Sequence, residues 1–153
     1  MSLAALWTTP PPVRKVERKV SPAILVGIVD ISADGQQLLS ALLFSLGCRI
    51  MTVDCQSDSG GAIAARIRGG APQVVVWQLG PAHESSCEPL LSLLAAGTFG
   101  ETSLVVVSPA PAETRAILAN HDVLVLPAPY TPVTLMHAVA AAQAATRRDR
   151  ITT

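Results

Sequence analysis

The sequence predicts an α/β fold, a doubly wound sandwich built on a five-stranded parallel sheet in the order 2-1-3-4-5. Short apolar segments typical of buried strands alternate with segments of helical periodicity, and the connections between them are short. The segment around which the chain is organised, residues 72–81, contains Val74, Val75, Val76 and Trp77 in succession. A half-exposed strand would alternate polar and apolar residues, so we expect this strand to be central and buried on both faces.

The other elements follow in order along the chain, each recognised by its own pattern. Strands are apolar runs that end in a polar residue or a turn, and helices begin at a capping residue and end near glycine or asparagine. The remaining strands are expected at 23–30, 49–53, 103–108 and 122–126. Helices are expected from Asp34 to Leu46, from Ser59 to Gly69, from after Ser86 to Gly97, from Ala112 to Ala119, and from Pro132 to about Thr146.

Some helix details are specific enough to be tested. Asp34 is expected to cap the first helix, and Asn120 to end the fourth in a left-handed conformation. The last helix, capped by Thr131, is expected to bury Val133, Met136, Val139 and Ala140. In the first helix the spacing places Leu38, Leu39, Leu42, Leu43 and Leu46 on the inward face.

Composition excludes several functional classes. Lysine plus arginine equals aspartate plus glutamate at 11 each, so no global field favours nucleic acid. The cysteines Cys48, Cys55 and Cys87 follow no zinc or disulfide spacing, and no apolar run is long enough to cross a bilayer. We therefore expect a cytoplasmic protein with no metal, no cofactor, no membrane contact and no direct nucleic-acid contact.

Three regions differ in composition along the 153 residues. Residues 1–21 carry three consecutive prolines and a small basic cluster, which predicts an extended or flexible arm. An alternative is that this arm packs on a partner through Leu6, Trp7, Val13 and Val16. Residues 22–147 form the predicted domain, and residues 148–153 are a C-terminal tail or the start of a linker.

Residues 23–146 carry landmarks at the ends of the expected strands. With these landmarks the chain resembles the receiver domain of bacterial response regulators in two-component signalling, a CheY-like, flavodoxin-like fold. Receivers have an acidic pair after the first strand, the phosphoaccepting aspartate after the third, Ser or Thr after the fourth, and Lys-Pro-aromatic after the fifth. The positions that match these landmarks here are Asp30 with Ile31, Gln78, Ser108, and Ala128 with Pro129 and Tyr130.

Three of these positions depart from the receiver pattern. Gln78 replaces the phosphoaccepting aspartate, Ile31 the second acid and Ala128 the lysine. An acyl phosphate needs a carboxylate nucleophile, clustered acids for a divalent cation and a cationic side chain, so the resemblance implies a pseudo-receiver that is not an enzyme. The resemblance also predicts a cis peptide between Ala128 and Pro129.

A narrower likeness is to the receiver of AmiR/NasT-type transcription antitermination regulators. It rests on residues 33–35, on 46–49 and on Leu93 to Thr98 with the strand that follows. In that group a coiled coil and an RNA-binding output domain follow the receiver. The resemblance implies a role in transcription regulation and leaves open whether an output domain follows here.

Two functions remain open on the sequence. The favoured one is a signalling module that acts by protein-protein interaction or homodimerisation, through Tyr130 and the alanine-rich last helix. The candidate surface residues there are Ala141 and Ala145, with Arg147 and Arg148 as a polar rim. The alternative is a small-molecule or nucleotide sensor that binds at the carboxyl ends of the strands.

Overall fold

A parallel sheet of five strands organises the computed structural model, which describes residues 24–30, 32–54, 60–80 and 83–152. The strand order is β2-β1-β3-β4-β5 and every pairing is parallel, so the predicted topology is confirmed. The strands are β1 (Leu25–Asp30), β2 (Arg49–Asp54), β3 (Val74–Gln78), β4 (Ser103–Ser108) and β5 (Leu124–Pro127).

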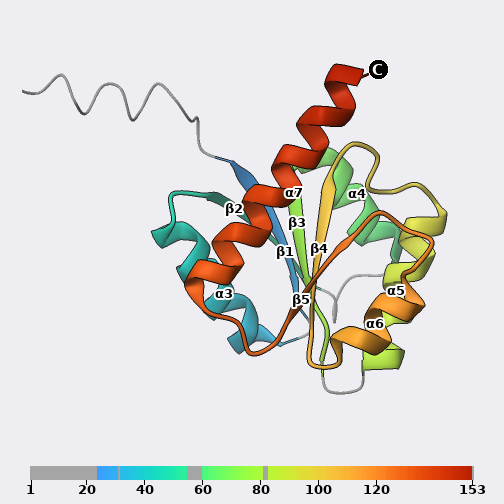
Figure 1. The fold of residues 1–153 in the computed structure, drawn as a ribbon, viewed down its shortest axis with the longest axis horizontal. Helices are drawn as coiled ribbons and strands as arrows, with labels where there is room; N and C mark the ends of the chain where they lie inside the picture. The colour runs from blue at the N-terminus through green and yellow to red at the C-terminus, as the bar shows by residue number, and fades with distance from the viewer. Residues whose placement is uncertain (1–23, 31, 55–59, 81–82, 153) are drawn as a thin grey trace, which may run out of the picture.

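Helices cover both faces of the sheet (Figure 1). On one face α3 (Ala33–Ser45) and α7 (Pro132–Thr152) pack on a core that includes Ile28, Val76 and Leu135. On the other face α4 (Gly60–Gly70) and α5 (His83–Ala95) pack on a core around Trp77. The short helix α6 (Pro111–Ile117) lies against β4 and β5.

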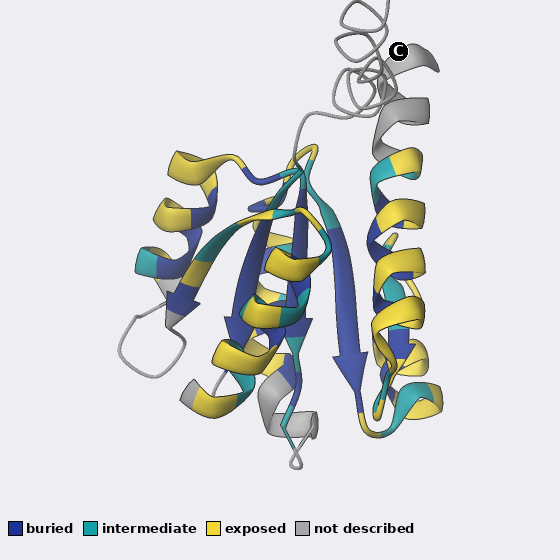
Figure 2. Cartoon of the chain, turned by 90° about the vertical axis from the view of Figure 1, so that its left-hand side faces the viewer, coloured by how far each residue is buried: buried dark blue, intermediate teal, exposed yellow. Residues whose placement is uncertain are grey.

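The central strand is buried as its composition predicts. Val74, Val75 and Val76 have no exposed surface and Trp77 is 2% exposed. Figure 2 shows the inner strands dark blue between helices whose outer sides are yellow. The Trp77 ring meets Phe99 edge to face, with ring centroids 6.5 Å apart, an arrangement that aromatic pairs favour.

Two predicted helix caps are wrong. Ser32, not Asp34, caps α3: its backbone is extended and its hydroxyl accepts the Gly35 N–H at 3.1 Å. Asp34 therefore falls in the first turn. Asn120 does not take the left-handed conformation, because α6 ends earlier, at Ile117, and Leu118 closes it. The cap by Thr131 is confirmed, since its hydroxyl accepts the Thr134 N–H at 3.1 Å. The expected cap Ser59 lies outside the described residues.

The inward stripes of α3 and α7 are partly wrong. Val133 is 62% exposed, Met136 51% and Leu38 61%, and Ala140 is also exposed. The inward side of α7 is set by its one fully buried leucine, and the small alanines beside it let the helix approach the sheet closely. The buried residues of this helix are Leu135, Ala138, Val139 and Ala142.

The last helix is longer than expected. The sequence predicts an end near Thr146, whereas α7 continues to Thr152. Figure 1 shows its C-terminal turns projecting past the edge of the sheet. Within the described residues no helix has the length and apolar character needed to span a membrane.

Candidate functional site

The carboxyl ends of the five strands meet at one edge, and most of the predicted site residues lie there. Asp30 is in register with Asp54 on one side and with Gln78 on the other. Ser108 ends the next strand, in register with Pro127. The structure thus brings together Asp30, Gln78, Ser108 and the corner from Ala128 to Tyr130. Ile31 and the Asp54 side chain lie outside the described residues.

Asp30 is a buried carboxylate, 4% exposed, that shapes the turn between β1 and α3. Its Oδ1 accepts the Ser32 N–H at 2.8 Å, which fixes the residue that caps the helix. Gly35 lies directly over the carboxylate, so that a side chain at this position would overlap it. These contacts give Asp30 a structural task that does not involve a phosphoryl group.

Gln78 ends the central strand at the position where a receiver carries its phosphoacceptor. It is half-buried, and its Oε1 is buried without a hydrogen-bond partner among the described residues. An unpaired buried acceptor costs free energy, so a donor from a ligand or a partner would be favoured there. An amide, however, has no carboxylate oxygen that could attack phosphorus.

Ser108 is fully buried and its hydroxyl is occupied within the turn that follows β4. Its Oγ lies 2.6 Å from the Thr114 Oγ1 and accepts the Ala110 N–H at 3.0 Å. The Ser108 carbonyl accepts the Ala128 N–H at 2.8 Å, which ties β4 to the corner after β5. Sequence reasoning identified Ser108 but not Thr114, whose buried hydroxyl is a polar group inside an otherwise ordinary helix.

The corner after β5 consists of Ala128, Pro129 and Tyr130. The peptide between Ala128 and Pro129 is cis, as predicted. Ala128 is half-buried against the α3 and α7 side of the core and carries no charge. Tyr130 packs on the same cluster. Its burial and, secondly, the negative charge of Asp30 raise the pKa of its phenol.

The candidate partner residues lie on α7, beside β5. Ala141 is exposed and Ala145 half-buried, and with Leu124 and Asp122 they line a hollow of about 180 Å³. Arg147 and Arg148 belong to the same helix, but their side chains are outside the described part. Across the described residues no three His, Cys, Asp or Glu side chains form a group that could hold a metal ion.

Several solved structures share this fold. Chemotaxis protein CheY4 of Vibrio cholerae matches with a TM-score of 0.62 and 17% identity, over 79% of this chain and 99% of that one. A response regulator receiver protein from Sinorhizobium medicae matches with a TM-score of 0.61 and 20% identity, over 81% of this chain and 97% of that one. Anti-anti-sigma factor PhyR from Bartonella quintana matches with 0.63 and 10%, over 93% of this chain and 55% of that one.

These likenesses define the class of fold. The chain has the CheY-like, flavodoxin-type fold of receiver domains, as the sequence predicts. No protein-family model matches the sequence, and no curated protein matches it either. At these identities the solved structures establish the fold, and function has to be argued from the residues at the strand ends.

The proximity of Asp30 to Tyr130 can be tested by titrating the phenol. Replacing Asp30 by Asn removes the charge that raises the Tyr130 pKa, so we expect that pKa to fall towards its ordinary value near 10 while burial keeps it above. Tyr130 is the only tyrosine, so ultraviolet absorbance of the tyrosinate reports this residue alone.

The matched control is Asp34→Asn, which removes an exposed carboxylate from the first turn of α3. It should leave the titration unchanged. Because the folded pKa is the higher one, the phenol stabilises the fold below about pH 10, and this contribution is lost as the pH rises through the folded pKa. Equal titration curves for wild type and Asp30→Asn would contradict the effect of the Asp30 charge on the Tyr130 pKa.

Proposed function

We propose that this chain is a degenerate receiver, a signalling module that is not phosphorylated and works by binding another protein or a second copy of itself. The observation that carries the proposal is Gln78, an amide at the phosphoacceptor position of a receiver fold. Ala128 at the position of the lysine supports it, because phosphoryl transfer needs positive charge opposite the acceptor. Asp30 and Ser108, which match the receiver pattern, have local hydrogen-bond partners instead.

Two further parts of the proposal depend on these residues. The chain has no enzymatic activity of its own. Among the described residues, the strand ends suggest only the receiver reaction, in which a carboxylate takes up a phosphoryl group, and Gln78 is not a carboxylate. Its likeness to AmiR/NasT-type receivers, which rests on segments such as 33–35 and 46–49, supports a role in transcription antitermination or a related regulatory step. PhyR, an anti-anti-sigma factor of the same fold, supports signalling through protein contacts.

The contact surface that we propose is formed by α6, β5 and α7. Ala141 and Ala145 on α7 allow a partner helix to approach closely, and the hollow beside them can receive a side chain. Tyr130 lies at the start of the same face, with Arg147 and Arg148 further along the helix. Without a phosphorylation trigger, this surface is either always available or controlled by whatever else binds the chain.

One observation favours a second candidate function, a sensor for a small molecule at the strand ends. The buried Oε1 of Gln78 has no partner among the residues that the structure describes, and a ligand N–H or O–H would satisfy it. A thermal-shift screen with nucleotides and small metabolites separates the two. A ligand that stabilises wild type but not Gln78→Leu would favour the sensor.

The first prediction concerns phosphorylation. Incubation of wild type with acetyl phosphate and Mg²⁺ should add no phosphoryl group, because Gln78 offers no nucleophilic carboxylate. Intact-mass spectrometry measures the result, with a phosphorylatable receiver in the same reaction as the reagent control. A mass increase of one phosphoryl group would mean that another acid, such as Asp30 or Asp54, accepts it.

A further prediction concerns the α7 surface, for the case that the chain binds a second copy of itself. Ala141→Glu with Ala145→Glu adds two charges to this surface and should weaken self-association about tenfold or more, because unpaired charge at a contact is costly. Sedimentation over a concentration series measures the effect. Ala41→Glu with Ser45→Glu, equally spaced exposed positions on α3, is the matched control.

The control variant should sediment like wild type. If both double variants behave like wild type and melt at the same temperature, α7 is not the contact surface.

A further inference from the structure

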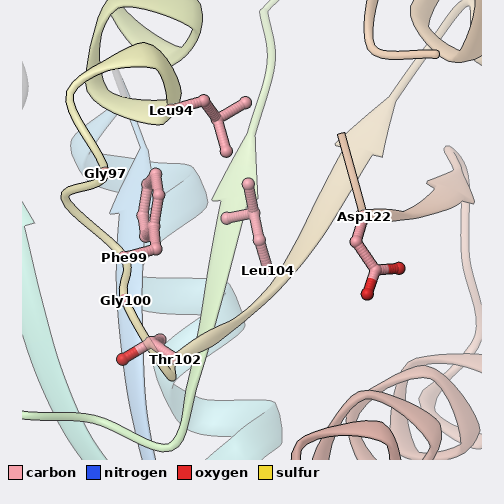
Figure 3. Close-up of a pocket in the computed structure, with 7 residues that line it drawn as sticks. All are labelled: Leu94, Gly97, Phe99, Gly100, Thr102, Leu104 and Asp122. Atoms are coloured by element: carbon pink, nitrogen blue, oxygen red, sulfur yellow. The ribbon is translucent and has the colours of Figure 1, made fainter. Parts of the chain in front are cut away.

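A hollow of about 230 Å³ opens at the opposite edge of the sheet, where the strands begin. It lies between the end of α5, the loop into β4 and the turn before β5 (Figure 3). Leu94, Phe99 and Leu104 give it an apolar wall, and Thr102 and Asp122 contribute polar groups. It is far from the strand ends that carry the receiver landmarks, so the proposed function does not account for it.

The loop that forms the hollow is held firmly. The Thr102 hydroxyl donates to the Pro72 carbonyl at 2.8 Å, and the Thr102 N–H donates to the Phe99 carbonyl at 2.7 Å. Phe99 is itself fixed by its edge-to-face contact with Trp77. A pocket held open by such contacts binds an occupant without first ordering the loop.

The charge at this hollow is negative. Asp122 lines the hollow and is exposed, and Glu101 is exposed in the loop between Phe99 and Thr102. Its lining residues include no lysine, arginine or histidine. An occupant with apolar side chains next to cationic ones would therefore fit both the wall and the rim.

Residues 13–19 of this same chain have that chemistry. They contain four basic residues and one acidic residue, and Val13 and Val16 stand three positions apart. This spacing places both valines on one side in a polyproline-type or a helical conformation. The segment lies in residues 1–23, which are outside the described part of the chain.

The segment is attached close to the hollow. The described chain begins at Ile24, at the same edge of the sheet, and the Leu25 N–H donates to the Gln73 Oε1 at 2.9 Å. Gln73 also bonds to the start of β4, because the Ser103 N–H donates to the Gln73 carbonyl at 3.1 Å. Gln73 thus links the start of β1 to the start of β4.

The distance from the start of β1 to Asp122, just before β5, is short. The strand order places β1 three positions from β5, a distance of roughly 14 Å at about 4.8 Å per strand. The basic cluster precedes Ile24 by some five to ten residues, which reach about 17 to 33 Å when extended. The cluster is thus the first part of the N-terminal segment that can reach Asp122.

We propose that residues 13–19 of the N-terminal segment dock into this hollow of their own chain. Val13 and Val16 contact the wall formed by Leu94, Phe99 and Leu104, and a lysine or arginine of the segment pairs with Asp122. This docking is independent of the proposed function. If the α7 surface is a contact surface as proposed, the docked segment would lie beside it, since Asp122 also lines the hollow next to Ala141 and Ala145.

Trypsin cleavage of the full-length protein tests the docking. Trypsin cuts after lysine and arginine, so the segment supplies its own four sites, and cleavage follows the population of the undocked segment when docking is fast. Asp122→Lys reverses the charge at the rim and should speed cleavage within residues 13–19 by about threefold or more, as expected for the loss of an exposed ion pair and its replacement by repulsion. Mass spectrometry of the fragments counts cuts in this segment alone and leaves out any cut after the introduced lysine. Added salt should speed the cleavage of wild type in the same direction.

The matched control is Asp34→Lys, the same charge reversal at an exposed aspartate on the opposite edge of the sheet. It should leave cleavage unchanged. As a second measurement, replacing the four basic residues of the segment by Glu should shift the backbone amide resonances of residues 97–102 and 122, and not those near Asp30.

Three results would overturn the proposal. One is cleavage of wild type within the segment as fast as that of Asp122→Lys. Another is that the amide resonances at the hollow stay unchanged when the basic residues of the segment are replaced by Glu. The third is protection that grows with protein concentration, which would show that a second copy supplies the segment. None of these readouts involves phosphodonors or partner binding, so they separate this proposal from the proposed function.

Discussion

The parallel pairing of β3 between β1 and β4 is the constraint on which the rest of the structure depends. A strand paired on both edges and covered on both faces must be apolar, and Val74 to Trp77 meet that requirement with almost no exposed surface. Parallel pairing also forces all strand ends to meet at one edge and all strand starts at the other. The receiver landmarks lie at the first of these edges, and the hollow lined by Phe99 and Asp122 lies at the second.

Three features at the carboxyl edge agree with the receiver frame that the sequence resembles. The cis peptide before Pro129, the buried Asp30 and the buried Ser108 all belong to that frame. Asp30 Oδ1 accepts the Ser32 N–H, and the Ser108 hydroxyl lies within hydrogen-bond distance of the Thr114 hydroxyl. A buried polar group with a local partner stabilises the turn that holds it, which is reason enough for these residues to be present.

The sequence predicted the strands and their order, because apolar runs and turn residues are local signals. The cis peptide and the residues expected at the carboxyl edge came from the resemblance to receivers. For α7 the sequence was right about Val139, which is buried, and wrong about Val133 and Met136, since these two fit the helical spacing as well as Leu135 and Ala138 do. It did not predict the hydrogen bond between Ser108 and Thr114 or the hollow beside Asp122. Both depend on residues brought together by the fold, for which the linear sequence holds no spacing rule.

If the proposed function holds, the carboxyl edge of this receiver fold does not respond to a phosphoryl group. Nuclear magnetic resonance of the full chain, before and after addition of beryllofluoride with Mg²⁺, tests it most directly, because beryllofluoride mimics a phosphoryl group on a carboxylate. For a receiver that is not phosphorylated, we expect unchanged amide resonances for Asp30, Gln78, Ser108 and Ala128. Saturable shifts at these four residues, absent with Mg²⁺ alone, would contradict it.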